Sequence, residues 1–231
     1  IRFTRMTNIT KHKIAIFDLD ETLLAGDSSC LWTNYLWEKK RVTDPAFLAL
    51  DKQMIADYYA ERLNINKYLH QHLSYFNQHN IEEINQWVTD FTHTIIKPLL
   101  YPQGINTINL YRQQNIPVII ISATMSFLVH AIAKQLNADI SMGIDMQIKN
   151  NHYTGHIEGI PTFREGKVTR LNQWKEQNNI NNSYIYFYTD SANDLPLCYQ
   201  ANEVITINAD ERLSQIATEK EWQQCYWQLN K

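Results

Sequence analysis

Short apolar segments that end in acidic or hydroxyl side chains are the feature that most constrains this chain. Residues 13–18 (KIAIFD), 117–122 (PVIIIS) and 183–190 (SYIYFYTD) are rich in β-branched and aromatic residues. Such runs are typical of the central strands of a parallel sheet that helices cover on both faces. Because ligands bind beyond the carboxyl ends of such strands, we expect the polar ends of the three runs to form one site.

The segments between these runs have helical periodicity. Residues 103–117 and 126–136 carry apolar side chains on one face, and we expect them to form helices that connect parallel strands. Residues 203–208 (EVITIN) are expected to form a further strand towards the edge of the sheet. Residues 142–159 alternate around an Asn-Asn pair and indicate a hairpin at the sheet edge. The predicted fold class is α/β, with a Rossmann-like parallel sheet.

Residues 29–98 differ from the rest of the chain, because they contain amphipathic helical patterns and no convincing strand. The clearest pattern runs from Ile81 to Ile95 and should end before Pro98. We interpret the stretch as a helical insertion after the first strand, with its aromatic side chains in the core of a small bundle. The predicted domains are a core of residues 11–28 and 99–231 and a cap of residues 29–98.

The composition argues against several classes of function. The formal net charge is −3 at pH 7, so no strong basic field favours nucleic acid as a partner. The longest aliphatic run, residues 118–122, is far shorter than the roughly 20 residues that cross a bilayer. The 3 cysteines form no CxxC pair, and residues 1–13 lack the apolar stretch of a secretory signal. We therefore expect free thiols and a cytoplasmic protein.

Acidic residues follow two of the predicted central strands. Asp18 and Asp20 stand two positions apart at the end of the first, and Asp190 and Asp194 follow another. Carboxylates that share one site repel each other, and a divalent cation relieves this repulsion. Mg²⁺ prefers oxygen ligands, commonly one or two carboxylates together with water and substrate phosphate. The acids therefore indicate a magnesium site at these strand ends.

Two further motifs suit the binding of a phosphoryl group. Ser122 and Ala123, in ISAT, come where a helix is expected to start, and main-chain N–H groups at such a start bind anions. Lys167, in FREGK, supplies a positive charge, and Asn193 lies between the two acids of TDSAND. Each motif alone is unspecific, since a turn, a helix cap or a surface charge would explain it. Their joint occurrence in this order is the stronger signal.

In this order, the motifs resemble those of the haloacid-dehalogenase superfamily of phosphotransferases, and within it the phosphoserine-phosphatase-like branch. DLDET resembles the first motif, ISAT the second, Lys167 the third and YTDSANDLP the fourth. An insertion after the first motif is also where that branch carries a helical cap. The resemblance implies the fold of this superfamily, an α/β core with an α-helical cap, and the activity of a Mg²⁺-dependent phosphatase.

The resemblance also implies a role for each motif residue. Asp18 would be the nucleophile that forms an aspartyl-phosphate, and Asp20 would protonate the leaving alcohol and later deprotonate water. Mg²⁺ would bind the Asp18 carboxylate, the Asp20 main-chain carbonyl and Asp190, with Asp194 behind these ligands. The residues implied in binding the phosphoryl group are Ser122, Ala123, Lys167 and Asn193.

Two residues bear on the substrate, and both have a structural alternative. Asp27 falls where phosphoserine phosphatases carry a Glu that meets the substrate's amino group, yet an Asp before Ser28 equally suits a helix cap. Arg164 is a candidate for contact with a phosphate or a substrate carboxylate, or for a place on the surface. Thr189 and Ser191 stand where phosphoserine phosphatases usually have glycines, so the substrate stays open.

We expect a small phosphorylated metabolite as substrate, similar to phosphoserine or histidinol phosphate. A phosphorylated lipid headgroup such as phosphatidylglycerophosphate, bound by a peripheral enzyme through its aromatic cap, is one alternative. A phosphate-binding regulatory module without catalysis is another. The intact pair Asp18 and Asp20 argues against the latter, because a module without catalysis has no need of both.

Overall fold

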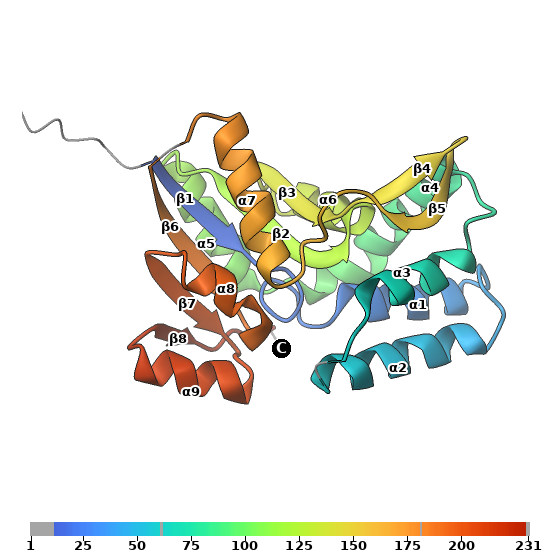
Figure 1. Cartoon of the computed structure of the whole chain (residues 1–231), viewed down its shortest axis with the longest axis horizontal. Coiled ribbons are helices and arrows are strands. Elements are labelled where there is room, and N and C mark those ends of the chain that lie inside the picture. Colours follow the sequence, from blue (N-terminus) through green and yellow to red (C-terminus); the bar gives the residue numbers. More distant parts are fainter. Residues whose placement is uncertain (1–11, 61, 181, 230–231) are drawn as a thin grey trace, which may run out of the picture.

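A six-stranded parallel sheet forms the centre of the molecule (Figure 1). The fold is that of a computed structural model, which describes residues 12–60, 62–180 and 182–229; residue 11, the first of the predicted core, and residues 1–10 lie outside. The strand order is β3–β2–β1–β6–β7–β8, and every neighbouring pair is parallel. The strands are β1 (His12–Phe17), β2 (Val118–Met125), β3 (Ile140–Ile144), β6 (Ser183–Thr189), β7 (Glu203–Ile207) and β8 (Gln223–Cys225).

Alternate side chains of the central strands enter two hydrophobic layers, one on each face of the sheet. Ile14 and Ile16 of β1 pack in one layer with Leu171 of helix α7. Phe17 lies in the other layer with Ile132 of α6. Both faces are thus covered, which confirms the predicted α/β class. The helices of the core are α5 (Pro102–Gln113), α6 (Ser126–Gln135), α7 (Glu165–Gln177), α8 (Leu195–Cys198) and α9 (Glu211–Glu219).

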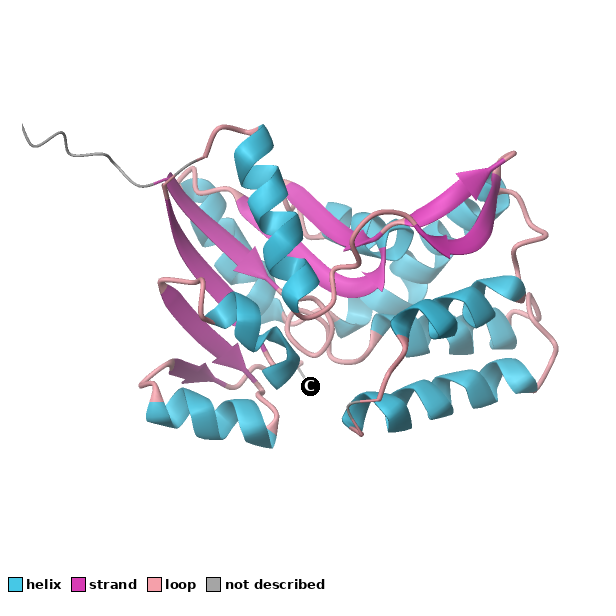
Figure 2. Cartoon of the chain, in the orientation of Figure 1, coloured by secondary structure: helices cyan, strands magenta, loops and turns pink. Residues whose placement is uncertain are grey.

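Between β1 and β2, the described chain forms helices and no strand (Figure 2), as the sequence predicts for the insertion. Trp32, Phe76 and Phe91 are fully buried, and the ring of Trp32 contacts the rings of the other two, so these aromatic side chains form the interior of the bundle. The boundaries of a separate cap domain stay a prediction. The helices are α1 (Ser28–Glu38), α2 (Ala46–Tyr59), α3 (Ile65–Ser74) and α4 (Ile81–Phe91), followed by a π-helical turn (Thr92–Ile96) and a 3₁₀ turn (Lys97–Leu99).

The two chain segments that join the insertion to the core lie side by side. The Ala25 N–H donates to the Leu99 carbonyl at 2.8 Å, and the Tyr101 N–H donates to the Leu23 carbonyl at 2.9 Å. The ring of Trp32 meets the ring of Phe127, on core helix α6, edge to face at 6.2 Å between centroids. The insertion therefore packs on the core through its own aromatic interior.

One sequence expectation about the sheet edge was wrong. Strands β4 (Met146–Lys149) and β5 (His152–Ile157) form the expected hairpin, but in a two-stranded sheet of their own. The hairpin instead packs against the insertion: the Ile81 N–H donates to the Asn151 carbonyl at 3.1 Å. Strand β3, whose parallel pairing with β2 the alternating pattern did not indicate, occupies the edge.

No helix in the described part of the chain is long and apolar enough to span a bilayer. The three cysteines, Cys30, Cys198 and Cys225, carry free thiols, as their spacing predicts.

Candidate active site

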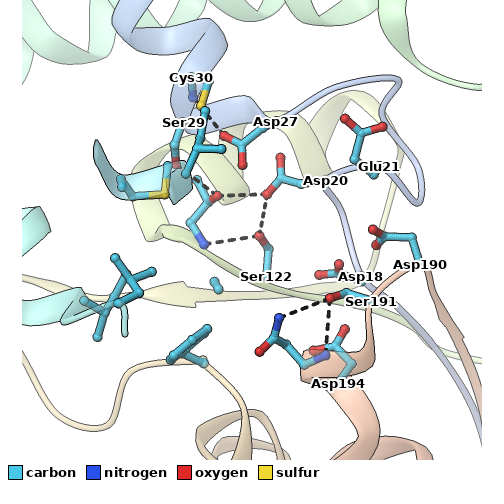
Figure 3. A pocket seen from close by; sticks show the side chains of 18 of the residues that line it. Asp18, Asp20, Glu21, Asp27, Ser29, Cys30, Ser122, Asp190, Ser191 and Asp194 are labelled. Carbon is cyan, nitrogen blue, oxygen red and sulfur yellow. Dashed lines mark hydrogen bonds between the residues drawn. The ribbon is translucent and has the colours of Figure 1, made fainter. Parts of the chain in front are cut away.

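A cavity of about 390 Å³ opens where β1, β2 and β6 end and extends between the core and the helical insertion (Figure 3). The polar ends of the three predicted strands therefore meet in one place, as parallel strands with a common direction require. The cavity is lined by nine of the sequence-predicted site residues: Asp18, Asp20, Asp27, Ser122, Ala123, Lys167, Asp190, Asn193 and Asp194.

Lys167 joins two of the predicted acids at the floor of the cavity. Its Nζ lies 2.8 Å from Asp18 Oδ1 and 2.7 Å from Asp194 Oδ1, and its side chain is 3% exposed. Burial raises the pKa of Asp18 to about 7, although Lys167 opposes this shift. Burial lowers the pKa of Lys167, but the two carboxylates raise it further, so that it lies above its ordinary value. Lys167 is therefore held as a cation beside Asp18.

The carboxylate of Asp20 has different partners from that of Asp18. Its Oδ1 accepts the main-chain N–H of Ser28 at 2.6 Å, at the start of α1. Its Oδ2 accepts the hydroxyls of Ser122 at 3.1 Å and Thr124 at 2.9 Å, both at the end of β2 (Figure 3). Asp20 thus connects the ends of β1 and β2 with α1, the first helix of the insertion. Among the described residues, no Lys or Arg forms an ion pair with it.

Asp190 completes the acidic group at the strand ends. Its Oδ1 accepts the Thr22 hydroxyl at 2.9 Å. Burial raises its pKa well above the ordinary value, and the charge of Asp18 adds to the shift. No described group of three or more His, Cys, Asp or Glu side chains is arranged around a metal position. The predicted magnesium ligands need only two side chains, Asp18 and Asp190, with the main-chain carbonyl of Asp20.

Arg164 is the predicted site residue that does not line the cavity. Its Nε donates to Asn193 Oδ1 at 3.0 Å, and its guanidinium lies over the ring of Phe163 at 5.0 Å. Asn193 and Phe163 do line the cavity, so Arg164 supports its wall from outside. The residue has φ of 51° and ψ of −121°, a backbone region that favours glycine.

The sequence left two interpretations of Asp27 open, a helix cap and a contact with the substrate, and the position of its side chain allows both. Its Oδ1 accepts the Cys30 N–H at 2.8 Å and caps helix α1. It also lines the cavity beside Asp20 (Figure 3). Burial raises its pKa to about 7, and the neighbouring charge of Asp20 contributes. A helix cap in this position therefore also presents a carboxyl group to the cavity.

Several hydrogen-bonding residues of the site were missed by the sequence reasoning. Isolated Ser and Thr side chains carry no distinctive pattern, and only the fold shows that these contact the acids. Asp210 is different, because it follows the predicted strand at 203–208 and the strand-end argument could have found it. Its Oδ2 accepts the Ala192 N–H at 2.7 Å and holds the loop after β6. The residues missed are Thr22, Ser28, Thr124, Thr189 and Asp210.

Comparison with known proteins places this arrangement in a family. A family model described as haloacid dehalogenase-like hydrolase matches residues 15–198. A histidinol-phosphatase of Neisseria meningitidis serogroup C (strain 8013) is 32% identical over 213 residues, which cover 90% of this chain and 96% of the relative.

Solved structures agree with the family match. A protein of unknown function from Bordetella pertussis Tohama I has a TM-score of 0.85 and 31% identity, covering 93% of this chain and 98% of that one. A substrate-bound phosphoserine phosphatase has a TM-score of 0.65 at 18% identity, covering 95% and 94%, and shares the fold. The chain therefore belongs to the haloacid dehalogenase-like hydrolases, as a phosphoric monoester hydrolase.

Proposed function

We propose that this enzyme hydrolyses a small phosphomonoester with Mg²⁺, through an aspartyl-phosphate, the acyl phosphate of the Asp18 carboxylate. The observation that carries the proposal is the meeting of four charged residues in one cavity: Asp18 and Asp20 after β1, Asp190 after β6, and Lys167 in the first turn of α7. The metal would supply positive charge that draws the phosphoryl oxygens to Asp18 and offsets the charge of the transition state.

The donor atoms around Asp18 suit Mg²⁺. Asp190 is a buried carboxyl group whose pKa the charge of Asp18 raises, and it accepts the neutral hydroxyl of Thr22. Two carboxylates and a main-chain carbonyl oxygen form a hard-ligand set that leaves room for water and a phosphate oxygen. Buried carboxylates that lack a counter-charge are costly, and a divalent cation would relieve this cost.

The two acids at the end of β1 have environments that fit two roles. One oxygen of Asp18 would attack phosphorus, and the bond from phosphorus to the leaving oxygen would break as Asp20 passes a proton to that oxygen. Asp20 would then take a proton from water, which attacks phosphorus and breaks the bond to Asp18. The hydroxyls of Ser122 and Thr124 can turn to accept a hydrogen bond, so their contacts with Asp20 persist when it is protonated.

Lys167 would bind the phosphoryl group while it stays paired with Asp18. A cation held in place by two carboxylates needs no rearrangement when negative charge develops on the phosphoryl oxygens. The Ser122 hydroxyl and the main chain at Ala123 would bind the remaining oxygens, and both residues line the cavity.

Support for a small metabolite comes from the cavity and from the relatives. The fully buried Trp32, Phe76 and Phe91 lie inside the insertion and give a lipid surface no aromatic anchor. The histidinol-phosphatase of Neisseria meningitidis matches most of this chain. Histidinol phosphate and phosphoserine are therefore the substrates to test, and in both the ammonium group would face Asp27.

Replacement of the nucleophile tests the mechanism. We expect Asp18→Asn to lower kcat for p-nitrophenyl phosphate in the presence of Mg²⁺ by more than about 10³-fold, because an amide cannot form the acyl phosphate. The matched control is Asp44→Asn, an exposed aspartate whose Oδ1 caps helix α2 away from the cavity. A folded Asp18→Asn variant with the activity of the control would refute the assignment of Asp18.

A further inference from the structure

The part of the cavity that faces the helical insertion has an apolar wall. Met54 and Ile55 come from α2, Leu63 precedes α3, and Ile65 and Leu69 belong to α3. Ile55 is 40% exposed and lies at the rim of the cavity rather than in the protein interior. The wall continues into the space that holds Asp18 and Asp20, so the group attached to a bound phosphate would lie against it.

Two acidic residues belong to the same region, Asp27 just before the helical insertion and Asp51 within it. Asp27 lines the cavity directly. Asp51, on α2, is 7% exposed and accepts the hydroxyl of Tyr68 at 2.7 Å, and Tyr68 itself lines the cavity. The charge of Asp51 also raises the pKa of Asp27, after the larger effects of burial and Asp20. This side of the cavity therefore carries two acidic groups, and Lys167 is the one basic residue in the described lining.

The basic residues of the described chain offer no balancing charge there. Lys167 is the one basic residue in the described lining, and its Nζ is bound by Asp18 and Asp194. Arg62 pairs with Asp57 at 3.1 Å, outside this lining. Two other arginines are also engaged outside the lining: Arg41 lies over Trp87 at 4.9 Å, and Arg164 donates to Asn193.

From this distribution of charge we infer that the enzyme takes phosphorylated amino alcohols without a carboxylate, and discriminates against phosphorylated amino acids. The inference rests on the proposed phosphatase function and names its substrate class. An ammonium group beside Asp27 would supply the missing counter-charge, with Asp51 adding to the attraction through the same low-dielectric space. A carboxylate on the same carbon would face two acids and no free cation, and would lose its hydration without compensation.

The apolar wall adds a second element of specificity. A ring or short chain on the amino alcohol would cover Met54, Leu63 and Leu69, whereas a bare two-carbon leaving group would leave this surface in contact with water. Larger amino alcohols should therefore be better substrates than the smallest one.

A matched series of phosphate esters tests the inference. Aminoethyl phosphate carries the ammonium alone, O-phospho-L-serine adds a carboxylate, and n-propyl phosphate replaces the ammonium with a methyl group of similar size. We expect kcat/KM for aminoethyl phosphate to exceed that of each of the others by about tenfold or more, the usual effect of one charged hydrogen bond. L-Histidinol phosphate, which adds a ring, should exceed aminoethyl phosphate.

Removal of the charge from Asp27 gives the decisive comparison. Asn still caps a helix, so Asp27→Asn changes the charge while it preserves the cap. We expect the ratio of kcat/KM for aminoethyl phosphate to that for n-propyl phosphate to fall about tenfold or more, whereas Asp44→Asn should leave the ratio at its wild-type value.

Three outcomes separate this inference from the proposed function. Equal or better turnover of phosphoserine than of aminoethyl phosphate would overturn the inference and leave the phosphatase mechanism intact. An unchanged ratio in a folded Asp27→Asn variant would also overturn it. Failure of the wild type to hydrolyse any of these esters, or p-nitrophenyl phosphate, in the presence of Mg²⁺ would instead refute the proposed function itself.

Discussion

At the scale of single residues, the two acids of the DLD motif differ because their partners differ. Asp18 shares the cation Lys167 with Asp194, while Asp20 accepts one main-chain N–H and two hydroxyls. The sequence predicts the acids and the lysine, because their motifs occur together in the order that the family has. It does not predict the Ser28 and Thr124 contacts, since a single hydroxyl residue has no pattern that separates it from a surface residue.

Asp27 makes the stability of the fold depend on pH. Its carboxyl group ionises near 3.8 in the unfolded chain and near 7 in the folded protein, because burial disfavours the charge. Between these pH values the folded state binds more protons than the unfolded state, so stability falls as pH rises from about 4 to about 7. We expect Asp27→Asn, measured without divalent cations, to gain stability relative to wild type over this range, by at most about 4 kcal/mol.

Urea unfolding at pH 4, 6 and 8 measures this difference. Asp44→Asn is again the control, because Asp44 caps a helix from an exposed position. A gap between Asp27→Asn and wild type that stays constant from pH 4 to pH 8 would show that the carboxyl group titrates alike in both states.

At the scale of elements, the sequence predicts those strands and helices that a local pattern of apolar residues encodes. β1, β2 and β6 follow from apolar runs and α4 from its helical stripe, and an Asn80 capping box begins that helix. β8 has the sequence QQC, which no strand pattern distinguishes. The sequence prediction assigns the hairpin β4–β5 to the edge of the main sheet, and this is wrong. The position of the hairpin depends on contacts with α3 and α4, which are distant along the chain.

Helix α7 positions Lys167, and Gly166 at its first turn allows this placement. A Cβ built on Gly166 would overlap the carbonyl oxygen of Pro161, a backbone atom that cannot move independently. We therefore expect Gly166→Ala to displace the start of α7, to lower the free energy of unfolding by about 1–3 kcal/mol and to reduce kcat for an aryl phosphate.

Thr169→Ala provides the comparison for this variant, because Thr169 is exposed on the same helix, one turn from Gly166. It should unfold within about 0.5 kcal/mol of wild type and keep its activity. If Gly166→Ala behaves as Thr169→Ala does in both assays, the close approach of Gly166 to Pro161 is not what places Lys167.

At the scale of the whole molecule, one hydrophobic cluster runs from the core through the helical insertion. Phe17 and Ile132 of the core belong to the same cluster as Trp32, Leu69 and Phe91 of the insertion. The cavity lies along this junction, so its walls are held by the packing of both parts. The fold-level prediction succeeded because parallel strands bring their polar ends together, whereas the shape of the insertion depends on packing that periodicity alone cannot resolve.

The charge of the cavity is strongly unbalanced. Among described lining residues, Lys167 stands alone against many acids: Asp18, Asp20, Glu21, Asp27, Asp190, Asp194 and Asp210. Since a cation that binds only the folded state stabilises it, we expect Mg²⁺ to raise the thermal midpoint. At 100 times its dissociation constant, the gain would be about 2.7 kcal/mol, or roughly 5–10 °C for a protein of this size.

Asp190→Asn should separate binding at this site from general ionic effects. Burial raises the pKa of Asp190, so its ionised form destabilises the metal-free fold, and the amide should raise the midpoint measured in EDTA. The same variant removes a ligand and should lose most of the Mg²⁺-dependent rise, while sodium chloride at equal ionic strength should shift neither protein comparably. A full Mg²⁺ response in Asp190→Asn would mean that the cation binds elsewhere and that Asp190 is not one of its ligands.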